Sequence, residues 1–224
     1  MRKPVIAIDG YSSTGKSSIS KILAERLGLI HMDTGALYRG ITYYSLQCCA
    51  DAQGNINFEK VFDNLKNISL EFRKTGDVLT LFLDGEDISQ QIRTKEVSDH
   101  VSQIACQKEV RAFLLDTQRA IAAQGGVILD GRDIGTVVLP NADYKFFLTA
   151  SIEERTKRRF LELQKMGVEI SAEEVSHNLA TRDKIDSERE IAPLRQAQDA
   201  ILIDNSNMTK EETIAAIVSH IAEF

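Results

Sequence analysis

Residues 10–17 read Gly-Tyr-Ser-Ser-Thr-Gly-Lys-Ser and satisfy the pattern G-x-x-x-x-G-K-[ST] in full. The apolar run at residues 5–8 (VIAI) fits a strand buried on both faces of a sheet, and apolar residues recur at helical spacing over 19–27 until Gly28. Glycines let the backbone wrap closely around phosphates, while N–H groups and the helix N-terminus attract the anion. The sequence therefore predicts a phosphate-binding loop (P-loop) between a buried strand and a helix.

Within this loop, Lys16 would reach the β- and γ-phosphates of a nucleotide, and the Ser17 hydroxyl would face Mg²⁺. Ser18 also carries a hydroxyl, so the sequence leaves open which of the two approaches the metal. The candidate ATP contacts from this segment are Gly10, Tyr11, Ser12, Ser13, Thr14, Gly15, Lys16, Ser17 and Ser18.

Composition excludes several other classes of protein. The 224 residues are 43% hydrophobic and 27% charged, which is typical of an ordinary globular chain that folds as one domain, 1–224. A net charge of −6 gives no overall attraction to nucleic acid or to anionic membranes. Three cysteines without a C-x-x-C pair predict free thiols in a reducing compartment. With no signal sequence and no apolar run near the roughly 18 residues of a membrane span, we expect a cytoplasmic monomer.

Strand-like and helix-like segments alternate along most of the chain. This order predicts an α/β fold with a doubly wound parallel sheet. The expected strands are residues 5–8, 29–32, 127–129, 145–148 and 201–203. The expected helices are 19–27, 34–49, 152–165, 172–190 and 208–222, and residues 97–124 should be mostly helical. Residues 68–72 alternate instead, and turns at Thr75-Gly76-Asp77 and Asp84-Gly85 bound a second apolar run, so we expect a small antiparallel β insertion at about 66–92.

Two further motifs follow predicted strands. Residues 32–39 (MDTGALYR) carry Thr34 as a possible helix N-cap and Arg39 about one and a half turns into the helix, where it could point back at a phosphate. Residues 130–135 (DGRDIG) begin with Asp130, which would approach Mg²⁺ through a water molecule. The carboxyl ends of parallel strands meet at one edge of the sheet, so both motifs should face the P-loop. A capped helix with a solvent arginine, or a plain turn, are the alternatives.

Arginines gather on two later helices. Arg155, Arg158 and Arg159 lie on the first, and Arg182, Asp186 and Arg189 follow on the second at i, i+4 and i+7, which is one helical face. Such faces are often only solvated. In an acidic chain that already binds phosphate, however, arginines are well suited to stabilise the charge that develops in phosphoryl transfer.

Taken in order, the P-loop, residues 33–39, residues 130–135, the Arg158-Arg159 pair and the Arg182-x-x-x-Asp186-x-x-Arg189 segment resemble the bacterial cytidylate kinases, members of the nucleoside monophosphate kinase family. The resemblance covers nearly the whole chain. It implies a P-loop kinase core with a β insertion and a helical lid at about 150–190. The implied activity is transfer of the γ-phosphate of ATP to CMP or dCMP with Mg²⁺, by direct in-line transfer.

The same resemblance implies residue roles. Arg39 and Arg132 would hold the acceptor phosphate beside the Thr34 hydroxyl, and Arg189 would lie near it. The cytosine would face Ser102, Arg111 and Asp133, and the sugar would face Arg182 and Asp186. The lid over ATP would supply Arg155, Arg158 and Arg159. The catalytic residues implied are Lys16, Arg132 and Arg158.

This sequence departs from the family pattern at Tyr11 and Ser13, where proline and glycine are common, and at Ser17-Ser18, which replaces Gly-Thr. Two alternatives stay open. One is a small kinase for another acceptor, such as UMP or shikimate. The other is a nucleotide-dependent regulatory binding protein, although the Asn-Lys-x-Asp segment of a GTPase is missing, since Asp183-Lys184 lacks its partners.

Overall fold

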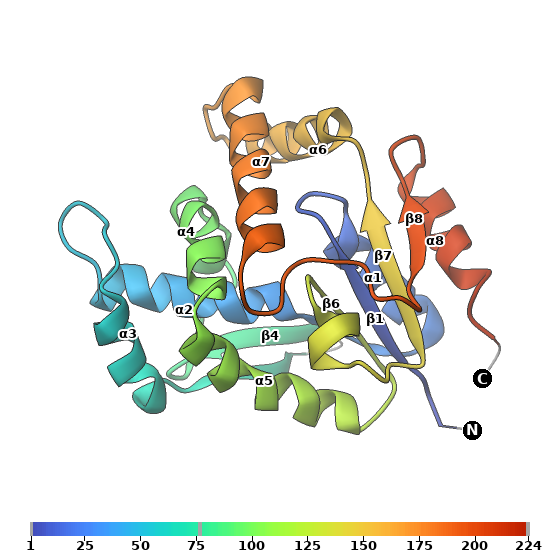
Figure 1. Ribbon diagram of the computed structural model, residues 1–224, viewed down its shortest axis with the longest axis horizontal. Coiled ribbons are helices and arrows are strands. Elements are labelled where there is room, and N and C mark those ends of the chain that lie inside the picture. Colours follow the sequence, from blue (N-terminus) through green and yellow to red (C-terminus); the bar gives the residue numbers. More distant parts are fainter. Residues whose placement is uncertain (1, 76–77, 223–224) are drawn as a thin grey trace.

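A computed structural model describes residues 2–75 and 78–222 of the chain. Its main sheet has five parallel strands in the order β2-β6-β1-β7-β8 (Figure 1). The strands are β1 (Val5–Gly10), β2 (Ile30–Asp33), β6 (Val127–Gly131), β7 (Tyr144–Thr149) and β8 (Ile201–Asp204). Strand β1 is buried throughout because helices cover both faces of the sheet. The predicted doubly wound parallel sheet is confirmed.

The two faces of the sheet belong to two separate hydrophobic clusters. Along β1, Ala7 points into a cluster with Leu37, whereas Ile6 and Ile8 point into another with Leu23. This is the period of two that a strand imposes on its side chains. The helices of the main fold are α1 (Lys16–Leu27), α2 (Thr34–Cys48), α4 (Lys95–Ala105), α5 (Lys108–Ala123), α6 (Ile152–Lys165), α7 (Ala172–Glu188) and α8 (Lys210–Val218).

Helix boundaries differ from the prediction in several places. Thr34 is not an N-cap, because Asp33 caps α2 by accepting a hydrogen bond from the Ala36 N–H at 3.1 Å. The stretch 97–124, expected to be mostly helical, contains two helices, α4 and α5, separated by Cys106 and Gln107. The closing helix begins at Lys210 instead of residue 208, because Thr209 forms a capping box there.

The expected antiparallel sheet is present and contains β3 (Leu70–Thr75), β4 (Val78–Leu83) and β5 (Glu86–Asp87). The turn expected at residues 75–77 includes 76–77, which lie outside the described residues. This sheet packs on α2 so closely that a Cβ on Gly40 would lie 2.9 Å from Leu70 Cδ1 and 3.2 Å from Leu81 Cδ2. The sequence did not predict the flanking elements α3 (Phe58–Asn64), η1 (Leu65–Asn67) and η2 (Gln91–Arg93).

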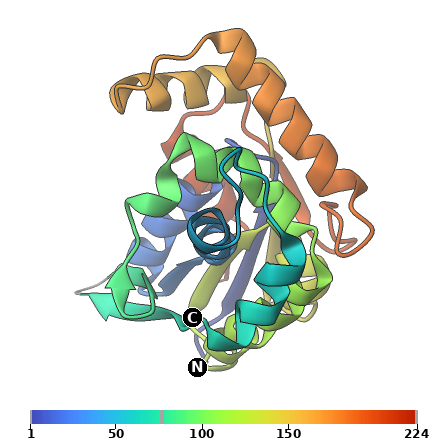
Figure 2. The same ribbon diagram turned by 90° about the vertical axis from the view of Figure 1, so that its left-hand side faces the viewer.

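Helices α6 and α7 form an arch beyond the carboxyl ends of the strands, as both views show (Figures 1 and 2). They pack on each other through Leu163, Val175 and Leu179, a cluster separate from those of the main sheet. After β6 the chain forms a short π-helical turn, η3 (Ile134–Val138). In the part of the chain that the structure describes, no helix combines the length and apolar character needed to cross a membrane.

Candidate functional site beneath the two arching helices

A crevice of about 1240 Å³ opens at the carboxyl ends of β1, β2 and β6, below α6 and α7. It brings together most of the residues that the sequence singled out. These are Ser12, Ser13, Thr14, Gly15, Lys16, Ser17, Ser18, Thr34, Arg39, Ser102, Arg111, Asp130, Arg132, Asp133, Arg158, Arg159, Arg182, Asp186 and Arg189. Among the described lining residues, Gly10, Tyr11 and Arg155 do not appear.

The P-loop has the backbone that its glycines allow. Gly10 has φ 148°, and a Cβ there would lie 2.0 Å from the Leu148 carbonyl oxygen, so β7 approaches too closely for any side chain. Ser13 takes a left-handed φ of 60°, which costs a non-glycine residue about 1–2 kcal/mol. Ser13, which stands where glycine is common, therefore adds backbone strain to the P-loop.

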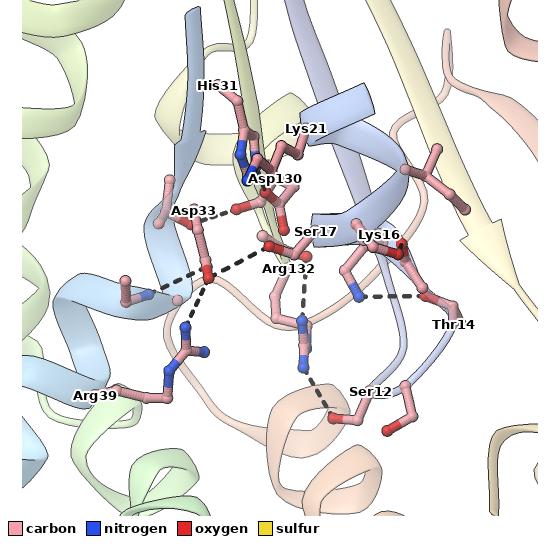
Figure 3. Close-up of a pocket in the computed structure, with 18 of the residues that line it drawn as sticks. Ser12, Thr14, Lys16, Ser17, Lys21, His31, Asp33, Arg39, Asp130 and Arg132 are labelled. Atoms are coloured by element: carbon pink, nitrogen blue, oxygen red, sulfur yellow. Dashed lines mark hydrogen bonds and ion pairs between the residues drawn. The ribbon is translucent and has the colours of Figure 1, made fainter. Parts of the chain in front are cut away.

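Lys16 begins α1 and curls back into the loop. Its ammonium donates to the Tyr11 carbonyl at 2.5 Å, and the residue is 6% exposed. It also lies 3.4 Å from the Thr14 hydroxyl (Figure 3). Burial, and then the charge of Arg132, lower the pKa of Lys16 well below its usual range. An anion that enters the loop would therefore stabilise the charged form of Lys16.

Arg155 holds the P-loop from behind instead of facing the crevice. Its guanidinium donates to the Ser12 carbonyl at 3.2 Å and pairs with Asp183, which in turn accepts the Ser12 N–H at 3.3 Å. The Tyr11 ring lies 5.3 Å from the Arg155 guanidinium and edge-on to Phe147. Asp183 was missed because the sequence analysis tested it only as part of a guanine-reading segment.

Arg158 makes a second connection between α6 and the P-loop. It donates to the Thr14 carbonyl at 3.3 Å and to the Asn205 side-chain and backbone oxygens at 3.0 and 2.8 Å. The Asn205 amide donates to the same Thr14 carbonyl at 2.9 Å. Asn205 was not among the predicted site residues, although it follows β8 at the same edge of the sheet as the residues after β2 and β6. That position was the available signal.

Carboxylates gather beside Ser17. The Ser17 hydroxyl lies 3.4 Å from Asp33, which pairs with Arg39 at 2.7 Å, and His31 Nε2 lies 2.5 Å from Asp130 (Figure 3). Burial opposes ionisation of Asp33, but Arg39 outweighs it and lowers the pKa of that carboxyl. Burial, and then the charge of Asp33, raise the pKa of Asp130.

These observations test the site for Mg²⁺. A hydroxyl and two carboxylates are the oxygen ligands that Mg²⁺ prefers. Burial and the neighbouring Asp33 charge both disfavour the ionised form of Asp130, and a cation bound beside these carboxylates would favour it. The donor set therefore fits the metal. Neither His31 nor Asp33 was among the predicted site residues, although Asp33 lay within a quoted motif and His31 precedes it on the same strand.

The opposite side of the crevice is rich in arginine. Arg132 donates from Nε to Asp186 at 3.0 Å and from Nη2 to the Ser12 hydroxyl at 2.8 Å, so it joins α7 to the P-loop. Asp133 lies between Arg111 and Arg189, the latter at 3.3 Å.

Arg182 is the least satisfied of these cations. Within the described structure its buried Nε has no hydrogen-bond partner. Burial, and then Arg132, lower the pKa of Arg182 to about 10. Converging arginines with one unpaired donor form a site for an anionic ligand with several oxygens. The Thr34 hydroxyl donates instead to the Asp130 carbonyl at 2.7 Å, and Ser102 is buried in the wall of α4.

The comparisons with known proteins agree along the whole chain. A family model described as cytidylate kinase matches residues 6–223. A cytidylate kinase from Bacillus cytotoxicus is 43% identical over 218 residues, which cover 97% of this chain and 96% of that relative. One from Flavobacterium johnsoniae is 46% identical over 220 residues, with 97% and 96% covered. The solved structure of an uncharacterized protein from Eubacterium ventriosum aligns with a TM-score of 0.51 at 12% identity over 98% of each chain, a likeness that concerns the fold alone.

Proposed function

Because this chain belongs to the cytidylate kinase family, we propose that it transfers the γ-phosphate of ATP to CMP or dCMP, giving ADP and CDP or dCDP. The observation that carries the proposal is the position of Arg132. It contacts the P-loop at Ser12 on one side and Asp186 of α7 on the other. A side chain between a donor loop and an arginine-rich acceptor side can touch both phosphates that must meet.

The chemistry is a direct in-line transfer. A phosphate oxygen of CMP forms a bond to the γ-phosphorus, while the bond from that phosphorus to the oxygen bridging the β- and γ-phosphates breaks, and ADP leaves with the bonding electrons. The acceptor phosphate is already ionised near pH 7, so the step needs no dedicated base. The protein's contribution is to align the two phosphates and to stabilise the charge that spreads between them.

We assign three residues to that stabilisation: Lys16, Arg132 and Arg158. Lys16 already turns into the loop, and its lowered pKa has an electrostatic cause that an entering phosphate removes. Arg158 is bonded to Thr14 and Asn205, so it would exchange those contacts for phosphate oxygens when the lid closes. The lid is proposed to span about 150–190 and to exclude water when both substrates are bound.

On the acceptor side, Arg39, Arg132 and Arg189 would hold the CMP phosphate. The cytosine would be read by Ser102, Arg111 and Asp133. The unpaired donor of Arg182, together with Asp186, would bind the sugar. A carboxylate accepts a hydrogen bond from the cytosine N4 amino group and repels the O4 oxygen of uracil. Asp133 would therefore favour binding of CMP over UMP.

Mg²⁺ would be held by the Ser17 hydroxyl and, through a water molecule, by Asp130. Bound there, it would neutralise part of the charge on the phosphates of ATP. The proximity of Asp33 to Ser17 adds a second carboxylate to this side. We further propose that the protein works as a cytoplasmic monomer without nucleic acid, in keeping with its net charge of −6 and nucleotide substrates.

A coupled ADP-release assay across several acceptors tests the proposal. With MgATP present, CMP and dCMP should give the highest kcat/KM, UMP less, and AMP, GMP and shikimate little above the rate without acceptor. Family membership favours CMP over these other acceptors. The proposal is wrong if shikimate or a purine monophosphate is the preferred acceptor, or if none of the six raises ADP release.

A further inference from the structure

Asp9 is a buried carboxylate that the proposed chemistry does not use. It lies next to the carboxyl end of β1, is 4% exposed, and is not among the described residues that line the crevice. Its two oxygens accept consecutive backbone N–H groups, one from Ile134 at 2.8 Å and one from Gly135 at 2.7 Å. A charged acceptor that takes two donors in this way makes hydrogen bonds about twice as strong as neutral ones.

The two N–H groups are the ones that a helical turn leaves unsatisfied. Residues 134 and 135 begin the turn η3, and the first N–H groups of such a turn have no acceptor within it. The residue that normally supplies the acceptor is the N-cap, and here the N-cap is Asp133. An aspartate at the N-cap commonly accepts a hydrogen bond from the first N–H groups of the turn that follows it.

Asp133 does not do so. In the described structure its side chain makes no capping hydrogen bond and instead accepts from Arg111 and Arg189, the latter at 3.3 Å. The capping carboxylate comes from the neighbouring strand, because β1 pairs with β6 in a register that sets Asp9 opposite Gly131.

We propose that Asp9 is a positioning residue for acceptor recognition: by capping η3 from β1, it leaves the Asp133 carboxylate to Arg111 and Arg189, which hold it in the wall of the crevice where the acceptor base would bind. The inference rests on the proposed function, in which Asp133 reads the acceptor base and CMP is the reporter of that recognition. Asp9 touches no substrate in this account and acts through the backbone of residues 133–135.

Close packing around the turn explains why its position matters. A Cβ on Gly135 would lie 3.4 Å from Asp9 Oδ2 and 3.2 Å from Lys145 Cδ. A Cβ on Gly131 would lie 2.7 Å from both Ile134 Cδ1 and Thr34 Oγ1. The turn is therefore held on two sides, and a shift of about 1 Å in the segment that carries Arg132 and Asp133 would disturb the acceptor contacts.

The variant Asp9→Asn tests the proposal because it keeps the size of the side chain. Its amide offers one acceptor oxygen, but its NH₂ group faces a second backbone N–H, which leaves that donor unpaired. We expect the Kd for CMP, measured by calorimetry, to rise about tenfold and the CMP-over-UMP ratio of kcat/KM to narrow, with the Kd for ATP changing less than about twofold. An unchanged CMP affinity and ratio, or an equal loss for ATP and CMP, would overturn the proposal.

Asp143 provides a matched control. It also accepts a backbone N–H of β1, from Val5 at 2.7 Å, but at the opposite end of the strand from the crevice. Asp143→Asn should leave the CMP affinity and the CMP-over-UMP ratio unchanged. The double variant of Asp9→Asn with Asp133→Asn should narrow that ratio little beyond Asp133→Asn alone. If the two effects add fully, Asp9 does not act through Asp133.

A spectroscopic measurement on the unaltered protein keeps the inference testable if Asp9→Asn does not fold. The Gly135 amide proton should resonate downfield and exchange slowly with solvent, as expected of an N–H bonded to a buried carboxylate. A rapidly exchanging Gly135 amide would contradict the proposal. This measurement uses no substrate. If the proposed function is wrong, the wild-type protein will not bind or phosphorylate CMP. If this inference is wrong, the Gly135 amide will exchange rapidly, or Asp9→Asn will bind CMP as the wild type does.

Discussion

Lys16 is the residue whose removal should separate transfer from folding most cleanly. Among the described residues, its ammonium donates only within the P-loop, to Tyr11 and weakly to Thr14. Lys16→Ala should therefore lower kcat by about 100-fold or more, since it removes a preorganised cation from the transferring phosphate. The melting temperature should fall by no more than about 4 °C, as expected for the loss of one hydrogen bond. Steady-state kinetics and calorimetry measure both quantities.

The control for Lys16→Ala is Lys60→Ala, an exposed lysine on α3 away from the crevice. That variant should keep wild-type kinetics. If Lys16→Ala also retains activity within a factor of about three, then the P-loop is not the donor site in the way that its sequence indicates.

Asp133 is the residue at which base preference should be decided. An asparagine there can rotate its amide and donate to the O4 oxygen of uracil, whereas the carboxylate repels it. Asp133→Asn should lower kcat/KM for CMP and narrow the CMP-over-UMP ratio by about 10- to 150-fold, the range expected for one mismatched buried polar pair. Both substrates carry the same phosphate, so their ratio corrects for any disturbance of Arg132. Equal losses for CMP and UMP would move base selection to Ser102 and Arg111.

Asp9 should make folding stability depend on pH. Burial, with a smaller contribution from Asp133, raises its pKa from 3.8 to about 7, although the Gly135 and Ile134 N–H groups and Lys16 oppose this. The folded protein therefore holds the Asp9 proton more tightly than the unfolded chain does. Its contribution to the free energy of unfolding falls as pH rises from about 4 to about 7 and is then constant.

Urea unfolding of the wild type and of Asp9→Asn at about pH 5, 6, 7 and 8 measures this contribution as a difference. The stability of the wild type relative to the variant should decrease over that range and level off near pH 7. A difference that grows with pH would mean that folding lowers the pKa of Asp9. Above about pH 7, the ionised carboxylate that caps η3 is thus maintained at some cost in stability.

At the scale of elements, the prediction succeeded where the pattern was repetitive and failed where it was short. The buried strands were found because residues 127–129 and 146–148 are continuously apolar. Gly28 was predicted as the end of α1 because glycine commonly follows a helix, and it takes a left-handed φ of 62° there. The turn η3 was not predicted, because Asp9 of β1 caps it and the sequence near residues 134–138 does not indicate this contact. Helix α3 was missed because its seven residues are too few to show a helical period.

Helices α6 and α7 should become more protected when both substrates bind. In this structure they are joined to the P-loop by Arg155 and Arg158, while Arg182 retains an unpaired donor on the crevice side. Phosphates entering the crevice would satisfy that donor and reduce the repulsion among the arginines. Hydrogen exchange with and without an inert bisubstrate analogue should show slower exchange over about 150–190. Equal exchange rates in both states would indicate a static helical face.

At the scale of the whole molecule, the sheet order explains how much of the site the sequence could predict. The P-loop and the segments after β2 and β6 come together because these three strands are neighbours, a consequence of parallel topology that can be argued from sequence. The roles of Asp183 and Asn205 could not be argued in this way. They arise because the arch of α6 and α7 and the end of β8 fold back against the P-loop backbone, a contact between distant segments with no sequence period.

The most direct test follows the labelled γ-phosphate itself. Wild-type protein is incubated with ATP labelled with ³²P at the γ-position, Mg²⁺ and CMP, and the products are separated by chromatography. We predict that the label appears in CDP in proportion to the ADP formed, that little appears as inorganic phosphate, and that omitting CMP stops turnover. Label recovered mainly as inorganic phosphate with or without CMP would contradict the account, and so would ATP that binds but remains intact, the behaviour expected of a regulatory nucleotide-binding protein.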